Sequence, residues 1–396
     1  MKKVLIADAP RKSSEKRRIL YLDAGSGSGG SSVSLVRLLK VLDRNRWTPV
    51  VITHRVGNMT EEMLTNGIPV FPIPLRPADR EGGLLRNIVM FYIPLFFRLL
   101  REFREIKPDV IHLNNSPREP LVAIWAASLL RIPVVAHLRT TRPLTRIELS
   151  LTKRLKALIV LSQMVKKLFE GQDVPSGKIR YIPDGIEIAH HEHLPLNAEK
   201  ARRQLGILNS EPVIGVVARL MPKKGQEQFI RAMAKVVKVY PNVKAVILGD
   251  ECETHSNYLS FLKNMVSQEE LSGNIQFTGW VEKPEDLYPA FDIVTQTSLL
   301  QEGLPSVCLE AMGIGIPVVS TRVGAVPELV EEGVAGLLVP PGDADAMAEA
   351  LLQLLQDERK RLEMGENARK RVIEHFNLRK TKEKMEALYE EVTQKR

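Results

Sequence analysis

The first half of the chain alternates short apolar runs with longer stretches in which apolar residues recur at a helical spacing. Each run spans four to six residues, which is the length of a buried strand. Runs of this kind between helices are typical of a parallel sheet that is covered on both faces. The predicted strands of this half are residues 18–23, 49–53, 70–73, 110–113, 134–137 and 157–161.

The alternation lapses around residues 188–200, and we interpret this polar segment as an interdomain linker. The alternation then restarts, so the sequence predicts a second sheet domain of similar size and a two-lobed α/β molecule with a cleft. Ligands of such folds bind at the carboxyl ends of the strands. The predicted strands of the second half are residues 213–217, 243–248, 275–278, 293–296 and 318–320.

The composition excludes several classes of protein. With 44% hydrophobic residues among 396, the chain is too apolar for intrinsic disorder, and its 25 glycines follow no collagen-like period. Cys252 and Cys308 are the only cysteines, which excludes a disulfide framework and a four-cysteine zinc site and favours a reducing, cytoplasmic compartment. We expect no secretory signal, because the apolar run 4–7 is short and charged residues follow it.

The charge is unevenly distributed along the chain. Residues 1–190 carry 31 Lys and Arg against 17 Asp and Glu, whereas the remaining residues carry 25 against 30. A basic first half favours an anionic partner for that half, such as lipid head groups or an acidic substrate.

The most apolar stretch, residues 84–100, permits two interpretations. It consists mainly of large apolar residues and includes Arg86 and Arg98, and Arg101 and Arg104 follow it. One interpretation is a helix packed in the core, and the other is a helix lying on a membrane surface beside basic residues. Its longest uninterrupted run, 88–97, is shorter than the roughly 20 residues of a membrane span.

A glycine-rich loop follows the first predicted strand. Gly25, Gly27 and Gly30 fit the spacing G-x-G-x-x-G between a strand and a helix. Glycines let the backbone approach a phosphate, and the amino end of a helix favours negative charge. A flexible strand-to-helix turn is the alternative. A dinucleotide site would also need an acidic residue after the second strand, where this chain has Thr53, His54 and Arg55.

The second half carries two charged motifs. Arg219 ends a predicted strand and Lys224 stands five residues later, at the start of a predicted helix, so that their two cations can grip a diphosphate. Glu302 and Glu310 bracket a loop, residues 303–306, that opens another predicted helix with free backbone N–H groups. Two acids so placed can bind different hydroxyls of one ligand while the amides hold its phosphate.

The arrangement Arg-x4-Lys followed about 80 residues later by Glu-x7-Glu resembles the family 4 retaining glycosyltransferases of the GT-B fold. Residues 302–312, Glu-Gly-Leu-Pro-Ser-Val-Cys-Leu-Glu-Ala-Met, are close to that family's signature, and residues 181–187 resemble its first-domain exit, with Asp184 where the family often has Asn. The resemblance implies two Rossmann-like domains whose parallel sheets face a central cleft. Residues 1–190 would bind the acceptor, 191–375 would bind the nucleotide sugar, and 376–396 would form a helix returning to the first domain.

The resemblance also implies roles for individual residues. Arg219 and Lys224 would bind the donor diphosphate and stabilise charge on the leaving group. Glu302 would bind hydroxyls of the transferred sugar, Glu310 would bind those of the ribose, and His137 matches a first-domain histidine of the active site. The other donor-binding residues implied are Gly27, Gly29 and Gly30 at the phosphates, Trp280 near the base, and Gly303, Leu304, Pro305 and Ser306 around phosphate and sugar.

The function implied is that of a retaining hexosyltransferase, using a UDP- or GDP-linked sugar and neither metal nor cofactor. We expect a hydroxyl acceptor on a glycolipid or an envelope polysaccharide precursor, and no nucleic-acid partner. The enzyme would work in the cytoplasm or peripherally on the inner face of the cytoplasmic membrane, with its basic first domain at the anionic surface.

Three rival functions stay open. An NADP-binding oxidoreductase would use the loop 25–30 and Arg55, an epimerase of the same fold would act on a nucleotide sugar alone, and a non-catalytic binder would need only the basic face. Two possible metal motifs are explained otherwise. The pair Asp343 and Asp345 is expected to cap a helix, and the cluster His190, His191 and His193 is expected to be solvated.

Overall fold

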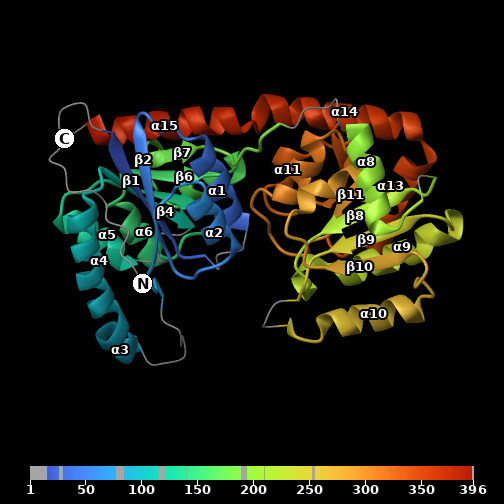
Figure 1. The fold of residues 1–396 in the computed structure, drawn as a ribbon, viewed down its shortest axis with the longest axis horizontal. Coiled ribbons are helices and arrows are strands. Elements are labelled where there is room, and N and C mark those ends of the chain that lie inside the picture. Colours follow the sequence, from blue (N-terminus) through green and yellow to red (C-terminus); the bar gives the residue numbers. More distant parts are fainter. Residues whose placement is uncertain are drawn as a thin grey trace. The chain divides into compact units, whose positions relative to one another are not determined.

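The computed structural model describes residues 16–25, 30–76, 84–115, 121–139, 141–188, 194–208, 210–251 and 255–394. The chain divides into two compact units (Figure 1). Unit 1 comprises Met1–Gly185 and Leu378–Arg396, and unit 2 comprises Ile186–Asn377, against predicted domain ends at residues 190 and 375. Each unit contains one parallel sheet between helices, so the α/β fold class predicted from the alternating pattern is confirmed.

The sheet of unit 1 has seven parallel strands in the order β3-β2-β1-β4-β5-β6-β7. The strand order reverses between β1 and β4, and in sheets of this kind ligands bind at that point, outside the carboxyl ends. The strands are β1 Arg17–Asp23, β2 Trp47–Thr53, β3 Val70–Pro72, β4 Val110–Asn115, β5 Val134–Leu138, β6 Ala157–Val160 and β7 Ile179–Tyr181.

Both faces of this sheet are apolar because successive side chains of a strand point to opposite faces. In β1, Leu20 and Leu22 pack in the cluster that includes α4 and α5, whereas Ile19 and Tyr21 pack in the cluster that includes α1 and α15. The helices of unit 1 are α1 Gly30–Val41, α2 Asn58–Thr65, α3 Leu84–Asn87, π-helical η1 Ile88–Tyr92, α4 Ile93–Ile106, α5 Leu121–Leu129, α6 Arg146–Thr152, α7 Gln163–Glu170, the short 3₁₀ turn η2 Ser176–Lys178 and α15 Leu378–Gln394.

Helix α15, the last of the chain, packs on unit 1 at two points. The hydroxyl of Thr381 donates to the main-chain oxygen of Pro183 at 3.0 Å, near the amino end of the helix. Farther along, the hydroxyl of Tyr389 lies 3.0 Å from that of Tyr21 and 2.7 Å from Nδ1 of His112. These contacts fix the C-terminal helix on the same face of the sheet as α1.

Gly185 permits this close packing, and its replacement by alanine is expected to destabilise unit 1. A Cβ at Gly185 would lie 2.6 Å from the hydroxyl oxygen of Thr381 and 2.7 Å from the main chain of Leu378. Overpacking of this kind costs about 1–3 kcal/mol. The free energy of unfolding from urea denaturation measures the loss. Gly177→Ala is the matched control, because a Cβ there meets nothing within 4 Å, and equal stability of the two variants would contradict the packing argument.

The sheet of unit 2 has six parallel strands in the order β10-β9-β8-β11-β12-β13, with its reversal between β8 and β11. The strands are β8 Val213–Val217, β9 Lys244–Leu248, β10 Ile275–Gly279, β11 Ile293–Gln296, β12 Val318–Thr321 and β13 Gly336–Val339. The helices are α8 Leu194–Leu205, α9 Gln226–Val239, α10 Tyr258–Gln268, α11 Ser306–Gly313, α12 Val326–Leu329, α13 Ala344–Gln356 and α14 Glu358–His375, with 3₁₀ turns η4 Pro222–Lys224, η6 Pro284–Asp286 and η7 Tyr288–Ala290.

The linker interpretation is wrong for residues 194–200, which begin helix α8. Pro195 is the second residue of this helix, a position where the missing N–H of proline costs nothing. Ala201 and Leu205 then bury their side chains in the core of unit 2, so the segment belongs to that unit.

Candidate active site

The charged motifs of the second half meet at the carboxyl edge of the sheet of unit 2. Arg219 and Lys224 follow β8, and Glu302 follows β11. These two strands are neighbours at the reversal of the strand order. The fold therefore brings residues separated by about 80 positions to the place where such sheets bind their ligands.

The turn that carries Lys224 is held against the segment after β11. The hydroxyl of Thr297 donates to the main-chain oxygen of Lys224 at 2.5 Å, and the N–H of Leu299 donates to that of Lys223 at 2.9 Å. Gly225 ends the turn with a φ of 69°, and a Cβ there would lie 2.0 Å from the main-chain oxygen of Thr297. Only glycine fits this position, so the main chain of Lys224 is fixed before any ligand arrives.

The side chains of Lys224 and Glu302 form the centre of the site. Nζ of Lys224 lies 2.5 Å from Oε1 of Glu302, which also accepts a hydrogen bond of 2.7 Å from the hydroxyl of Ser298. The two charged side chains keep 24% and 22% of their surface exposed. Both side chains are therefore partly open to solvent, and a ligand can reach either of them.

A second glycine anchors Glu302 from the other side. The N–H of Ala325 donates to the main-chain oxygen of Glu302 at 3.0 Å. Gly324 has a φ of 52°, and a Cβ there would lie 1.9 Å from that same oxygen. The loop after β12 thus presses directly on the main chain of Glu302, which positions the carboxylate beside Lys224.

The loop after Glu302 leads into helix α11, as predicted. Pro305 is the residue before its first turn and supplies no side-chain cap. The first N–H groups of any α-helix lack partners within the helix, and they attract anions. Gly303 to Ser306 are half-exposed, so this amino end is open to a ligand beside the Lys224–Glu302 pair.

Glu310 lies one helical turn after Ser306 and therefore on the same side of α11. The buried Tyr288 donates a hydrogen bond of 2.6 Å from its hydroxyl to Oε2 of Glu310. Cys308, between Ser306 and Glu310 on α11, is fully buried, and this burial raises the pKa of its thiol. A protonated, inaccessible thiol is no nucleophile, which leaves the two glutamates as the reactive side chains of the motif.

Arg219 and Trp280 stand at the same edge of the sheet. Nε2 of Gln226 donates to the main-chain oxygen of Arg219 at 2.9 Å, and the arginine side chain is exposed. Trp280 follows β10 and is 51% exposed. A Cβ at Gly249, after β9, would lie 1.9 Å from the main-chain oxygen of Ala218, so strand β9 meets the end of β8 by a close backbone contact.

In unit 1 the last residues of β1 and β4 form a polar cluster at the carboxyl edge. The buried carboxylate of Asp23 accepts hydrogen bonds from the N–H of Gly25 at 3.1 Å, the hydroxyl of Ser32 at 2.7 Å and the amide of Asn114 at 3.2 Å. These bonds tie the glycine loop to α1, whose first residue is Gly30. Gly27 and Gly29 lie outside the described residues.

The structure adds a pair that the sequence interpretation missed. Arg139, directly after β5, forms an ion pair with Asp184, and its Nε donates to Oδ1 of Asn114 at 3.3 Å. Each charged side chain is 12% exposed. The signal available in the sequence was Asp184, the acid where the resembled family often has asparagine, because a buried acid needs a cation nearby.

His137 lies inside unit 1, one residue before the end of β5. Its side chain is 1% exposed, its ring centroid lies 5.6 Å from that of His112, and neither of its nitrogens has a hydrogen-bond partner among the described residues. Burial lowers the pKa of both histidines well below the ordinary value, so both rings are neutral at pH 7. The catalytic role of His137 stays a prediction, and Arg139 is the residue that directly follows β5.

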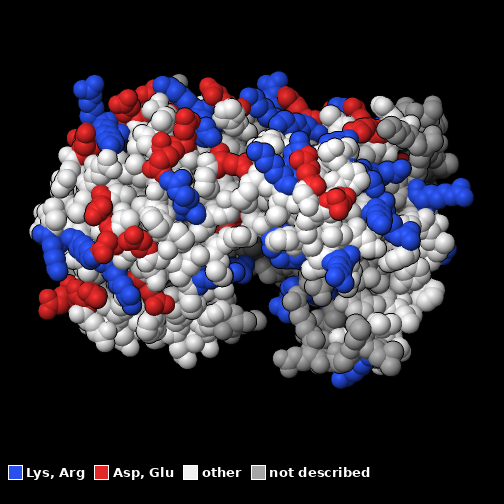
Figure 2. Space-filling view, turned by 180° about the vertical axis from the view of Figure 1, so that it is seen from behind, with Lys and Arg blue, Asp and Glu red and all other residues white. Residues whose placement is uncertain are grey.

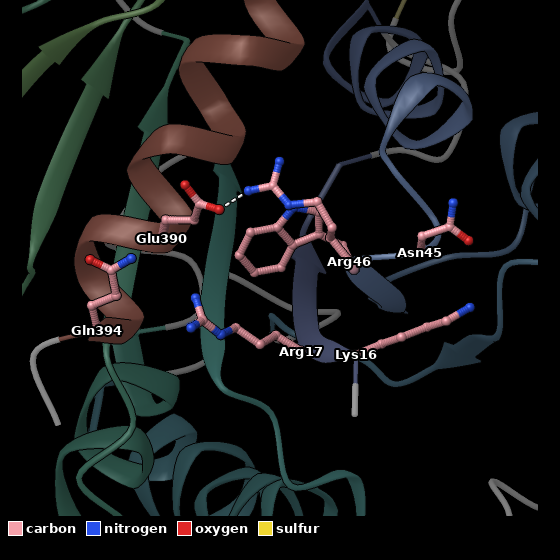
Figure 3. Close-up of a pocket in the computed structure, with 7 residues that line it drawn as sticks. Lys16, Arg17, Asn45, Arg46, Glu390 and Gln394 are labelled. Atoms are coloured by element: carbon pink, nitrogen blue, oxygen red, sulfur yellow. Dashed lines mark ion pairs between the residues drawn. The ribbon is translucent and has the colours of Figure 1, made fainter. Parts of the chain in front are cut away.

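Two other polar regions have structural explanations. Oδ1 of Asp343 accepts from the N–H groups of Asp345 and Ala346 at 3.0 and 2.9 Å, which confirms the predicted helix cap. Figure 3 shows a pocket at the amino ends of β1 and β2, whose Arg46 is paired with Glu390. There Arg17 donates to Thr393 at 2.9 Å, so both arginines are occupied within unit 1.

Metal ligation finds no support in the part of the chain that the structure describes, where no group of three His, Cys, Asp or Glu side chains is arranged to hold an ion. His190, His191 and His193 lie outside that part.

Two family models match the chain. The model described as "Glycosyltransferase Family 4" matches residues 28–190, and the one described as "Glycosyl transferases group 1" matches residues 197–371. The second match contains Arg219, Lys224, Glu302 and Glu310.

Similar proteins of known name support the same family. A D-inositol 3-phosphate glycosyltransferase of Corynebacterium jeikeium is 34% identical over 59% of this chain and 57% of its own length, so the chain spans little more than half of that relative. The lipopolysaccharide core mannosyltransferase LpsB of Rhizobium meliloti is 28% identical over 82% of this chain and 94% of its own length. The crystal structure of Anabaena HepE in complex with UDP and glucose has a TM-score of 0.80 and 27% identity, covering 93% of this chain and 98% of HepE.

Proposed function

Because the chain belongs to the family 4 glycosyltransferases of the GT-B fold, we propose that it moves a hexose from a nucleotide diphosphate sugar to a hydroxyl acceptor. The observation that carries the proposal is the Lys224–Glu302 pair at the strand reversal of unit 2, next to the amino end of α11. One cation, one carboxylate and free helix amides are the groups that a sugar diphosphate requires.

In this proposal unit 2 binds the donor. Arg219, Lys224 and the N–H groups at the start of α11 hold the diphosphate, while Pro305 has no N–H to give and only lines the site. Glu302 accepts hydrogen bonds from hydroxyls of the sugar. Glu310 does the same for the ribose, and its hydrogen bond from Tyr288 holds the carboxylate in place. The other donor-binding residues proposed are Trp280, Gly303, Leu304 and Ser306, with Gly27, Gly29 and Gly30 of unit 1.

The difficult step is departure of the nucleotide diphosphate. The bond between the anomeric carbon and the diphosphate oxygen breaks, and negative charge grows on that oxygen. The ammonium group of Lys224 leaves its ion pair with Glu302 and contacts the diphosphate, where its positive charge stabilises the leaving group. The acceptor oxygen attacks the same face, its proton passes to the departing phosphate, and the configuration is retained without a metal or another cofactor.

Unit 1 provides the acceptor side in this proposal. The names of relatives include a glycosyltransferase acting on inositol 3-phosphate and a mannosyltransferase of the lipopolysaccharide core. By analogy the acceptor is a glycolipid or an envelope polysaccharide precursor, reached at the inner face of the cytoplasmic membrane. His137 keeps its proposed catalytic role, and Arg139 with Asp184 offers a charged pair to acceptor hydroxyls at the carboxyl edge.

A thermal-shift panel tests the donor proposal. UDP, GDP, UDP-glucose and GDP-mannose are each added with and without EDTA, and at least one nucleotide is expected to raise the melting temperature equally in both buffers. The active donor is then supplied with acceptor lipid, and proton NMR of the product's anomeric signal reports the configuration. A melting-temperature shift with NADPH alone would overturn the nucleotide-sugar donor. A strict need for a divalent ion would overturn metal independence, and an inverted product would overturn retention of configuration.

A further inference from the structure

The longest helical stretch of unit 1, formed by α3, η1 and α4, is buried along one side only. Leu95, Leu99 and Phe103 of α4 are buried against the sheet and α5. In Figure 1, α3 and the start of α4 extend past the sheet of unit 1. The core interpretation of residues 84–100 is therefore correct for the inner side of α4 and leaves its outer side unexplained.

The outer side carries large apolar side chains in contact with solvent. Met90 is 72% exposed, Ile93 is 47% exposed and Phe97 is 62% exposed. Ile93 and Phe97 are four residues apart in α4 and share one side of it, and Met90 precedes them in the π-helical turn η1. We call these three residues the strip. Ile88 and Val89 in the π-helical turn add to it, since this turn has no buried residue. An apolar strip of this size on a soluble unit marks an interaction surface.

Arginines border the strip at both ends. Arg86 precedes it, and Arg98, Arg101 and Arg104 follow or flank it; all four are exposed. Arg101 is in the same row as Ile93 and Phe97, four residues farther along. Arg101 forms ion pairs with Glu102 and Glu105. The four arginines outnumber these two glutamates, so this part of the surface carries a net positive charge. Arginine stems lie along apolar surface while their guanidinium groups reach polar head groups.

We propose that this outer face, Met90, Ile93 and Phe97 with Arg86, Arg98 and Arg104, docks unit 1 on a bilayer containing anionic phospholipid. The apolar strip enters the boundary between head groups and acyl chains, and the arginines bind lipid phosphates. Charge favours this occupant over a second copy of the chain, because a symmetric contact through the strip would bring two sets of arginines together.

The charge of the whole unit agrees with a lipid partner. Residues 1–190 carry 31 Lys and Arg against 17 Asp and Glu. Figure 2 shows Lys and Arg widespread on the side of unit 1 that faces the viewer, at the right of the picture. In the described part of the chain no helix is long and apolar enough to cross a membrane, so the surface accounts for attachment by lying on the bilayer.

Vesicle flotation of the full chain tests the docking. The protein is expected to float with vesicles of phosphatidylcholine and phosphatidylglycerol, much less with phosphatidylcholine alone, and less at high salt. The double variant Ile93→Glu/Phe97→Glu is expected to lower partitioning by roughly tenfold or more, since burial of one such side chain is worth about that factor. Phe261→Glu is the matched control, because Phe261 is 49% exposed on α10 of unit 2, and its partitioning should equal that of the wild type.

The docking itself does not depend on the proposed function. Only its role, which is to bring unit 1 to a lipid-linked acceptor, rests on that proposal. Both variants should keep the melting temperature and the nucleotide-induced shift of the wild type, so a folding defect and a failure of the donor proposal are each recognised separately. Equal partitioning of wild type and double variant would overturn the docking. A wild-type protein that sediments as a dimer, together with a double variant that sediments as a monomer, would also overturn it. In that case the strip binds a second copy of the chain.

Discussion

Replacing Lys224 by alanine is expected to lower the turnover number by roughly 100- to 1000-fold, the effect of removing one fixed charge or donor from a developing oxyanion. The lysine main chain is fixed by Thr297 and by the glycine after it, so only the side chain has to turn from Glu302 to the diphosphate. The loss should appear mainly in kcat, with a smaller rise of the Michaelis constant, because Lys224 also contacts the diphosphate of the bound donor while the charge on the leaving oxygen grows only in the transition state. Steady-state release of nucleoside diphosphate measures it, with the donor identified by the thermal-shift panel.

The neighbouring Lys223 provides the control for this experiment. Its side chain is exposed on the same turn, and its main-chain oxygen accepts a hydrogen bond from Leu299 in the segment after β11. Lys223→Ala should keep the wild-type turnover. Lys224→Ala should stay folded in urea denaturation, because Glu302 is partly exposed and keeps its hydrogen bond from Ser298. Wild-type turnover of Lys224→Ala would remove the lysine from the mechanism.

Most of the sheet architecture could be predicted because a strand covered on both faces is a continuous apolar run. The two strands that the pattern missed, β7 and β13, lie at sheet edges. β7 has only three residues and includes Arg180, and β13 has four. Arg180 interrupts the apolar pattern of β7. The length of β13 does not explain its omission, because β6, β11 and β12 also have four residues and were predicted. Helix α8 resembles a linker in the sequence because Pro195 stands near its beginning and polar residues follow, while Ala201 and Leu205, which pack in the core, come later.

The charged site of unit 2 could be predicted as a set but not as a geometry. The spacing of Arg219, Lys224, Glu302 and Glu310 identified the residues. The ion pair between Lys224 and Glu302 depends on β8 and β11 being neighbours, and strand order is invisible in a hydrophobic pattern. Arg139 and Asp184 are 45 residues apart and come together because they follow β5 and β7, which end at the carboxyl edge of the sheet of unit 1 with β6 between them.

His137 illustrates how one residue of strand length changes an interpretation. The sequence ends the strand at residue 137, which would place the histidine at the open edge. The structure continues β5 to Leu138, so the imidazole points into the layer beneath α15, with His112 as its neighbour. Side chains alternate between the two faces of a strand, so the next side chain on the face of His137 is that of Arg139, directly after β5.

Replacing Glu310 by alanine is expected to weaken binding of the nucleoside diphosphate by roughly 10- to 100-fold, because a hydrogen bond to a charged group contributes about 1.5–3 kcal/mol. Titration calorimetry with UDP or GDP, whichever the thermal-shift panel selects, measures the dissociation constant. Glu349→Ala is the control, since Glu349 is an exposed glutamate on α13.

Tyr288→Phe separates orientation of the Glu310 carboxylate from its charge. This change removes only the hydroxyl that donates to Oε2 of Glu310 at 2.6 Å. A carboxylate without that donor still accepts from the ribose but is no longer held in one rotamer, so we expect a loss of affinity smaller than that of Glu310→Ala. If Glu310→Ala binds the nucleotide with wild-type affinity, the ribose is held elsewhere and Glu310 serves only to anchor Tyr288. If the tyrosine variant alone loses affinity, the contact to the nucleotide belongs to η7 rather than to α11.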